Sequence, residues 1–391
     1  MMRVESVGYK EKILTKDMLC VMLVTFLAGT AITTQMGTLP LYVAYLGGSE
    51  GDSGTIVGIL GIAALCVRIP IGKLLDRFGR KMILIVGLVI LVLDFTLLNL
   101  NHQLGFLFLL RLIQGAAMGI ENTAIGTMAS DLIPKSRLSA GLGYFSIAQT
   151  LPSAIGPFIG LYIVEHYGFE LLFLTGLILT ILAVLMSLLI SDHYKGQDKS
   201  KVKKTSSSKG ILKVQVVIPS LVLSLICLAN AGVTAFISQF ALEKNVANIG
   251  YYFTVNALMT VLVRLIYPRF LAGIKNSILV FVSILFIILS FVMIAYSNTL
   301  AGFLFAAILY AIGFASVFPI MNAIVLSNVG DHERGQATSI FSASLDVAYG
   351  SGAMVWGFVA MGVGFSNMYL VSAILPIISL IIMVKYRKKF F

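Results

Sequence analysis

Charged residues are scarce in this sequence. Only 12% of the 391 residues are Asp, Glu, Lys or Arg, whereas 58% are hydrophobic, and the mean hydropathy is +0.97. Soluble domains carry about 25% charged residues, so this chain lacks the charge to cover a water-facing surface. The scarcity of charge excludes a soluble globular protein and indicates an integral membrane protein.

Cysteine and histidine are also few. Cys20, Cys66 and Cys227 all lie inside apolar runs, which excludes a secreted domain held together by disulfides. Among four histidines there is no Cys/His cluster and no HExxH motif, and the chain has no P-loop, so we expect no metal site, no nucleotide site and no cofactor. An enzyme should offer a converging nucleophile, base or metal ligand, and a sensor an appended soluble domain. The sequence shows neither feature. We therefore expect a protein that is not an enzyme, and a sensor is also disfavoured.

Long apolar runs fill most of the chain. A helix needs about 20 residues to cross about 30 Å of hydrocarbon. The sequence predicts an all-α membrane protein with twelve spans, at about 18–46, 54–75, 82–100, 104–129, 138–164, 170–190, 213–241, 247–268, 277–297, 300–327, 335–362 and 366–384.

The positive charges follow the loops. Of the 28 Lys and Arg, 24 fall in seven segments on one side of the predicted membrane and only Lys244 falls in a loop on the other. Since basic residues collect in cytoplasmic loops, both termini are predicted to be cytoplasmic in a multi-pass protein of the cell membrane. Topology thus accounts for the net charge of +11, and nucleic acid is not an expected partner.

The chain divides into two equal halves around a Lys/Ser-rich stretch. We predict a first six-helix bundle, a cytoplasmic linker and a second six-helix bundle, at 1–190, 191–212 and 213–391. A shift of 196 residues places Arg68 on Arg264, and a shift of 197 places Arg137 on Arg334. Duplicated halves of this kind build a transport site between them.

The most specific motif runs from Gly72 to Lys81. Gly72, Leu74, Asp76, Arg77, Gly79, Arg80 and Lys81 match a G-x-L-a-D-r-x-G-r-k pattern, and in this the sequence resembles the major facilitator superfamily. The glycines suit a close helix approach and a tight turn, and Asp76 beside the arginines suits a latch, that is, an ion-paired contact that forms and breaks. The alternative is that the basic residues only anchor the loop in the cytoplasm.

Arg111 and Gln114 form an R-x-x-Q-G motif inside the fourth span and resemble a second motif of that superfamily. The resemblance implies a role in proton transfer, through an influence on a nearby carboxylate. An arginine inside a span is costly and needs a partner or water. The alternative is that Arg111 reaches out to the membrane interface.

Gly156, Pro157 and Gly160 in the fifth span resemble the end of a motif of superfamily exporters that exchange substrate for protons. The resemblance implies export. The copy is incomplete, because Ala148, Pro152 and Leu161 stand where glycines are expected. The alternative is that this segment only kinks the helix for packing and has no bearing on the direction of transport.

Three acids lie within predicted spans. Glu121, Asp346 and Asp94 are candidates for proton coupling, because intramembrane carboxyl groups often form proton relays. The alternative is that each acid is neutralised by a structural partner and takes no part in proton coupling.

Polar residues recur at central depth in several spans, and the resemblance places the first and seventh spans around the substrate cavity. The candidates for cavity lining are Thr30, Thr34, Gln149, Asn230, Thr234, Asn256 and Asn322. Hydrogen bonds between helices would explain these residues equally well.

Together these patterns predict a secondary active transporter, with protons, a small-molecule substrate and the lipid bilayer as its partners, acting as a monomer. The leading interpretation is proton-coupled export of small organic or amphiphilic molecules. Export of one host metabolite, such as a sugar or a siderophore-like chelator, is the runner-up, and nutrient uptake is third.

Overall fold

The computed structural model describes residues 13–100, 102–134, 137–191, 214–270, 275–327, 329 and 334–390. Regular secondary structure in these ranges is helical throughout. The helices are α1 (Lys16–Thr33), α2 (Leu39–Tyr45), α3 (Glu50–Phe78), α4 (Arg80–Leu100), α5 (Leu104–Leu132), α6 (Leu138–Tyr167), α7 (Phe169–Leu188), α8 (Val214–Glu243), α9 (Tyr251–Phe270), α10 (Asn276–Tyr296), α11 (Leu300–Ser327), α12 (Arg334–Ser372) and α13 (Ile374–Phe390).

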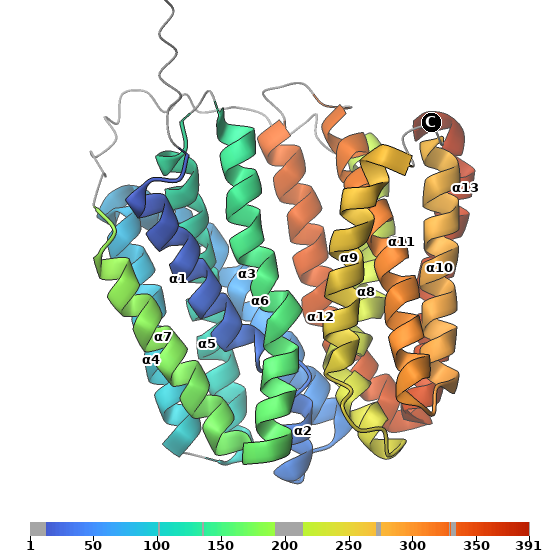
Figure 1. Cartoon of the computed structure of the whole chain (residues 1–391), viewed down its shortest axis with the longest axis horizontal. Helices are drawn as coiled ribbons and strands as arrows, with labels where there is room; N and C mark the ends of the chain where they lie inside the picture. The colour runs from blue at the N-terminus through green and yellow to red at the C-terminus, as the bar shows by residue number, and fades with distance from the viewer. Residues whose placement is uncertain are drawn as a thin grey trace, which may run out of the picture.

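The helices stand side by side in one bundle (Figure 1). Helices α1 to α7 occupy one side and α8 to α13 the other, with α3, α6 and α12 near the middle. The start of α1 and the end of α13 lie at the same end of the bundle, which we call the terminal end; the opposite end is the far end. The terminal end is the one predicted to face the cytoplasm.

Ten stretches of the described chain are long and apolar enough to cross a membrane. One of them, Ile340–Arg387, has 48 residues and changes direction at Gly364, where φ is +77°. At about 1.5 Å per residue it is long enough to cross twice. The all-helical membrane fold is confirmed, while the count of twelve spans and the orientation of the termini stay predictions.

The first predicted span is broken. The stretch 18–46 contains two helices, α1 and α2, separated by residues 34–38. Gly37 sits in this break with a φ of +77°, a left-handed conformation that favours glycine. A Cβ at Gly37 would lie 2.8 Å from the Ser238 hydroxyl, so glycine also allows α8 to come close.

Buried apolar residues form three clusters, the largest mainly in α8 to α13 and two smaller ones in α1 to α7. This distribution is compatible with the predicted two bundles, whose boundaries stay a prediction. The linker predicted at 191–212 lies outside the described residues except for Ser191.

The two halves touch mainly where α3 meets α12 and where α6 meets α9. We call these two contacts together the seam. Gly54 packs against Gly357, and Gly58 and Gly61 pack against Gly350, so the backbones of α3 and α12 come into direct contact. Small residues permit this approach inside a membrane.

Candidate functional site

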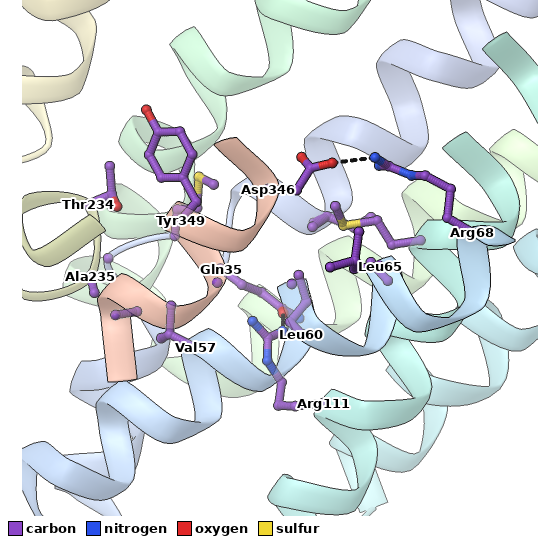
Figure 2. Close-up of a pocket in the computed structure, with 18 residues that line it drawn as sticks. Gln35, Val57, Leu60, Leu65, Arg68, Arg111, Thr234, Ala235, Asp346 and Tyr349 are labelled. Carbon is purple, nitrogen blue, oxygen red and sulfur yellow. Dashed lines mark hydrogen bonds and ion pairs between the residues drawn. The ribbon is translucent and has the colours of Figure 1, made fainter. Parts of the chain in front are cut away.

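A cavity of about 200 Å³ lies between the two halves, among α1, α3, α5, α8 and α12 (Figure 2). Most of its 18 lining residues are apolar. The charged or polar members are Gln35, Arg68, Arg111, Thr234, Asp346 and Tyr349. The cavity thus has an apolar wall with a few polar groups at fixed places, which is the usual character of a small-molecule site.

Arg68 of α3 and Asp346 of α12 form an ion pair at one side of this cavity (Figure 2). Their side chains are 37% and 38% exposed, so the pair is open to the cavity. Sequence reasoning selected Asp346 but left Arg68 outside the candidate site, although the internal repeat had singled out this arginine. The ion pair joins the two halves of the chain.

Arg111 of α5 is buried, with 5% of its surface exposed. Its guanidinium donates to the Gln35 side-chain oxygen at 2.5 Å, to the Gln114 side-chain oxygen and to the Ile56 carbonyl at 3.4 Å. Arg111 therefore does not reach out to the membrane interface. Its hydrogen-bond acceptors are amide and backbone oxygens, and the carboxylate near it is that of Asp94, to which it makes no hydrogen bond.

Gln35 was missed by the sequence analysis. It lies in the break between α1 and α2, is 2% exposed and lines the cavity. An amide within the first apolar run was visible in the sequence, but only the structure shows that the break turns this side chain to Arg111. Gln35 and Gln114 together hold the guanidinium at the cavity wall.

Asp94 of α4 and Glu121 of α5 are buried, at 1% and 3% exposure, and neither lines the cavity. Both carboxylate oxygens of Asp94 lack a hydrogen-bond partner among the described residues. Asp94 is close enough to Arg111 to interact electrostatically. Glu121 makes no hydrogen bond or ion pair within the described part of the chain, and its backbone lies against Gly87 of α4. Both acids thus sit behind the cavity wall.

Of the residues predicted to line the cavity, Thr234 does so and the others do not. The hydroxyls of Thr30 and Thr34 donate to carbonyls of α1, and Asn256 donates to the Ala307 carbonyl of α11. Gln149 is exposed on α6, Asn230 is buried on α8 close to Tyr349, and Asn322 is half-buried on α11. The alternative stated for these residues, hydrogen bonds between helices, fits Asn256, whereas Thr30 and Thr34 bond locally to carbonyls of α1.

Gly156 and Gly160, which flank Pro157 in α6, allow this helix to come close to the end of α1. A Cβ at Gly156 would collide with Thr33, and one at Gly160 would collide with the backbone of Thr34. The Thr33 hydroxyl also donates to the carbonyl of Pro152 at 2.9 Å. In this structure the segment packs two helices closely, and its bearing on the direction of transport stays a prediction.

The loop after α3 turns at Gly79, where φ is +85°. Arg80 pairs with Asp131 at the end of α5 at 3.0 Å, and Arg77 lies over the ring of Phe78. Gly72 has open space where a Cβ would be, so no described residue approaches it closely here. The side chain of Asp76 lies outside the described residues, and the latch stays a prediction.

A second cavity, of about 890 Å³, opens at the far end between the halves. Glu50, Glu165 and Glu243 are among its lining residues. Within the described ranges, no group of three or more His, Cys, Asp or Glu is placed to hold a metal ion.

Relatives of known sequence cover nearly the whole chain. An uncharacterized MFS-type transporter of Methanocaldococcus jannaschii is 26% identical, over 89% of this chain and 94% of its own length. The staphylopine export protein of Staphylococcus aureus is 22% identical over 88% and 89%, and the multidrug resistance protein MdtG of Proteus mirabilis is 25% identical over 91% and 92%. The three are named as a transporter, an export protein and a multidrug resistance protein.

The fold is also found among solved structures. A bacterial homolog of the human lysosomal transporter Spinster, in an inward-facing and unoccupied conformation, superposes with a TM-score of 0.80 at 14% identity, over 96% of this chain and 97% of that one. A model of the Major Facilitator Superfamily matches residues 21–300 and 222–389. The predicted multi-pass protein of the cell membrane is thereby confirmed. With its helical fold and its relatives in agreement, the chain belongs to the Major Facilitator Superfamily of transporters.

Proposed function

We propose that this transporter is a proton-coupled exporter of small organic molecules that works by alternating access. In this mechanism two bundles, 1–190 and 213–391, open the cavity first to one face of the membrane and then to the other. The observation that carries the proposal is the cavity at the seam, whose lining comes from both halves and includes the Arg68–Asp346 ion pair. Because this pair joins the halves, it has to break when they separate there. A substrate or proton that acts on the pair therefore shifts the balance between the two states.

Proton coupling is supported by the intramembrane acids. Asp346 faces the cavity, and Asp94 and Glu121 lie buried behind its wall. Carboxyl groups at membrane depth often act as proton relays. Protonation of Asp346 would remove the charge that holds Arg68, and thereby couple proton binding to opening of the seam. The driving force would be the proton gradient, with no bound cofactor and with one chain as the working unit.

Export is supported by the relatives, which include a multidrug resistance protein and a staphylopine export protein. The Gly156–Gly160 segment, with its likeness to an exporter motif, points the same way. A flexible cytoplasmic linker at 191–212 would let the two bundles move relative to each other.

The size of the cavity favours a second candidate, export of one specific metabolite. Sites for drug-sized ligands usually measure about 300–1,000 Å³. The cavity of about 200 Å³, with charged side chains in its wall, is better matched to a compact polar compound.

The test is a proton-flux measurement in proteoliposomes that contain purified protein and a trapped pH-sensitive dye. An imposed proton gradient and a panel of lipophilic cations, sugars and metal chelates would be applied in turn. We expect one class to trigger proton movement in wild-type vesicles and not in empty vesicles or in vesicles with Asp346→Asn. Substrate movement without proton movement would contradict the coupling, and the same flux in Asp346→Asn would contradict the role of the ion pair.

A further inference from the structure

Arg68 and Arg264 occupy equivalent positions in the two halves of the molecule. The offset of 196 residues that relates them in sequence also relates the observed helices: α4 covers Arg80–Leu100 and α10 covers Asn276–Tyr296. Gly168 and Gly364, again 196 positions apart, both have a left-handed backbone, with φ of +84° and +77°. The repeat is therefore structural, and Arg264 stands in α9 where Arg68 stands in α3.

The partners of these two arginines differ. Arg68 pairs with Asp346 of α12. In α6, the helix equivalent to α12, the corresponding position is Thr150 at an offset of 196 residues and Gln149 at an offset of 197. Neither side chain carries a charge, and the Thr150 hydroxyl donates to the Ser146 carbonyl within its own helix at 2.9 Å. The contact between α6 and α9 thus lacks the acid that the contact between α3 and α12 possesses.

Acidic residues are absent from the neighbourhood of Arg264 along both helices. Helix α9 contains none, and the acid of α6, Glu165, lies near the far end. Arg264 is exposed, and within the described ranges it makes no hydrogen bond or ion pair. The charge of Arg264 is therefore not neutralised by a residue of the described chain.

The face of α9 that carries Arg264 points to the other half. Arg264 follows Phe253 by 11 residues, and at 100° per residue this is about three full turns. The ring of Phe253 lies 3.5 Å from the place that a Cβ of Gly37 would occupy, in the break between α1 and α2. Arg264 thus lies on the seam-facing side of α9, about three turns closer to the terminal end than Phe253.

The other two arginines within spans have acids near them. Arg68 has Asp346, and Arg111, besides its neutral acceptors, has Asp94 within electrostatic range. The remaining span acid, Glu121, lies on α5 against α4, in the opposite half from α9. Arg264 lines neither of the two cavities described above, but it is exposed on the side of α9 that faces the other half. Since a guanidinium without a counter-charge in a membrane span is costly, its counter-charge is expected to come from a molecule that enters between the two halves.

From this asymmetry we infer that the substrate is an organic anion, and that its acidic group pairs with Arg264 between α6 and α9 as Asp346 pairs with Arg68 between α3 and α12. A guanidinium binds a carboxylate through two parallel hydrogen bonds, which fits this role better than a lysine would. The inference rests on the proposed transport function and names the chemical class of its substrate.

The test is counterflow in proteoliposomes without a proton gradient, so that the result does not depend on proton coupling. Two dyes with the same ring system but opposite charge, fluorescein and rhodamine 6G, would be compared, with citrate and anilinonaphthalene sulfonate as further anions. We expect wild-type counterflow of an anion in preference to rhodamine 6G, a loss of about tenfold in Arg264→Gln, and partial retention in Arg264→Lys. Thr150→Asp, which supplies an internal acid, should also lower anion counterflow.

Lys244→Gln serves as the matched control, because Lys244 is a cation at the far end that lies over the ring of Phe240. Size-exclusion profiles and anion counterflow in Arg264→Lys would separate loss of binding from loss of folding. Preference for rhodamine 6G, absence of counterflow for all the anions, or equal counterflow in Arg264→Gln and Lys244→Gln would overturn the inference. Anion counterflow that fails to move protons under a gradient would instead overturn the proposed proton coupling and leave the substrate class standing.

Discussion

Arg68 and Asp346 form an ion pair at the edge of the glycine contact between α3 and α12. Gly61 packs against Gly350, and its would-be Cβ lies 3.9 Å from the Asp346 carbonyl. Arg68 follows Gly61 by seven residues, or about two helical turns towards the terminal end. The close backbone contact between α3 and α12 therefore ends at an ion pair that faces the cavity. A molecule bound in the cavity can thus act on the contact between these two helices through the ion pair.

Replacing Asp346 by Asn should leave Arg68 without its counter-charge. Removing one member of a partly buried pair leaves the other charge poorly solvated, so we expect transport to fall about tenfold or more while the protein remains folded. Substrate uptake into inverted membrane vesicles, normalised to protein amount, is the measurement.

The exchanged double variant, Arg68→Asp with Asp346→Arg, is the informative companion. It restores an ion pair in reverse order and should recover part of the lost transport. If the double variant is no better than Asp346→Asn, the pair is not the unit that matters.

Gly58 should tolerate no side chain, since a Cβ there would collide with the carbonyl oxygen of Gly350. Gly58→Ala is expected to push α3 and α12 apart at a cost of about 1–3 kcal/mol, which should lower both the thermal unfolding temperature in detergent and the transport rate. Gly126→Ala on α5 is the control, because no described atom lies within 4 Å of the position of its Cβ. Equal effects of the two substitutions would show that helix propensity, rather than the α3–α12 contact, governs the result.

The all-helical membrane fold was predictable from the sequence, because the length of the apolar runs is set by the thickness of the membrane. The break between α1 and α2 was not, since residues 18–46 read as one apolar run. What breaks it is the left-handed backbone at Gly37 beside Ser238, a tertiary contact that apolar periodicity does not record. Loops and kinks set by such contacts need the structure.

The candidate site was predictable only in part. Asp346 and Thr234 were selected and do line the cavity, but Thr30 and Thr34 were selected and do not. The reason is that nearly all faces of a membrane helix are apolar, so periodicity does not tell which face turns inward. A hydroxyl can also donate to a carbonyl of its own helix, as Thr30 does to the Phe26 carbonyl at 2.7 Å.

Asp76 in the loop motif gives a separate prediction, which rests on the sequence resemblance. If its carboxylate forms and breaks contacts as the halves move, Asp76→Asn should slow transport several-fold and leave the amount of folded protein unchanged. Lys385→Gln, at the terminal end of α13, removes a charge of the same compartment without touching the motif and should be silent. Normal turnover of Asp76→Asn would remove the latch from the mechanism.

Glu121 provides the sharpest test of proton coupling, because it is buried in α5 without a hydrogen bond or ion pair to any described residue. Glu121→Gln keeps the size and polarity of the side chain but removes its ability to take up a proton. We expect the variant to retain substrate counterflow, which needs no proton movement, and to lose most of its transport driven by a proton gradient, together with the pH dependence of that transport. Asp94→Asn, measured in parallel, tests whether the acid near Arg111 takes up the proton instead. The comparison is apt because both carboxyl groups lie behind the cavity wall. If Glu121→Gln keeps the wild-type pH profile while Asp94→Asn loses it, the proton site belongs at Asp94, and Glu121 is a packing residue between α5 and α4.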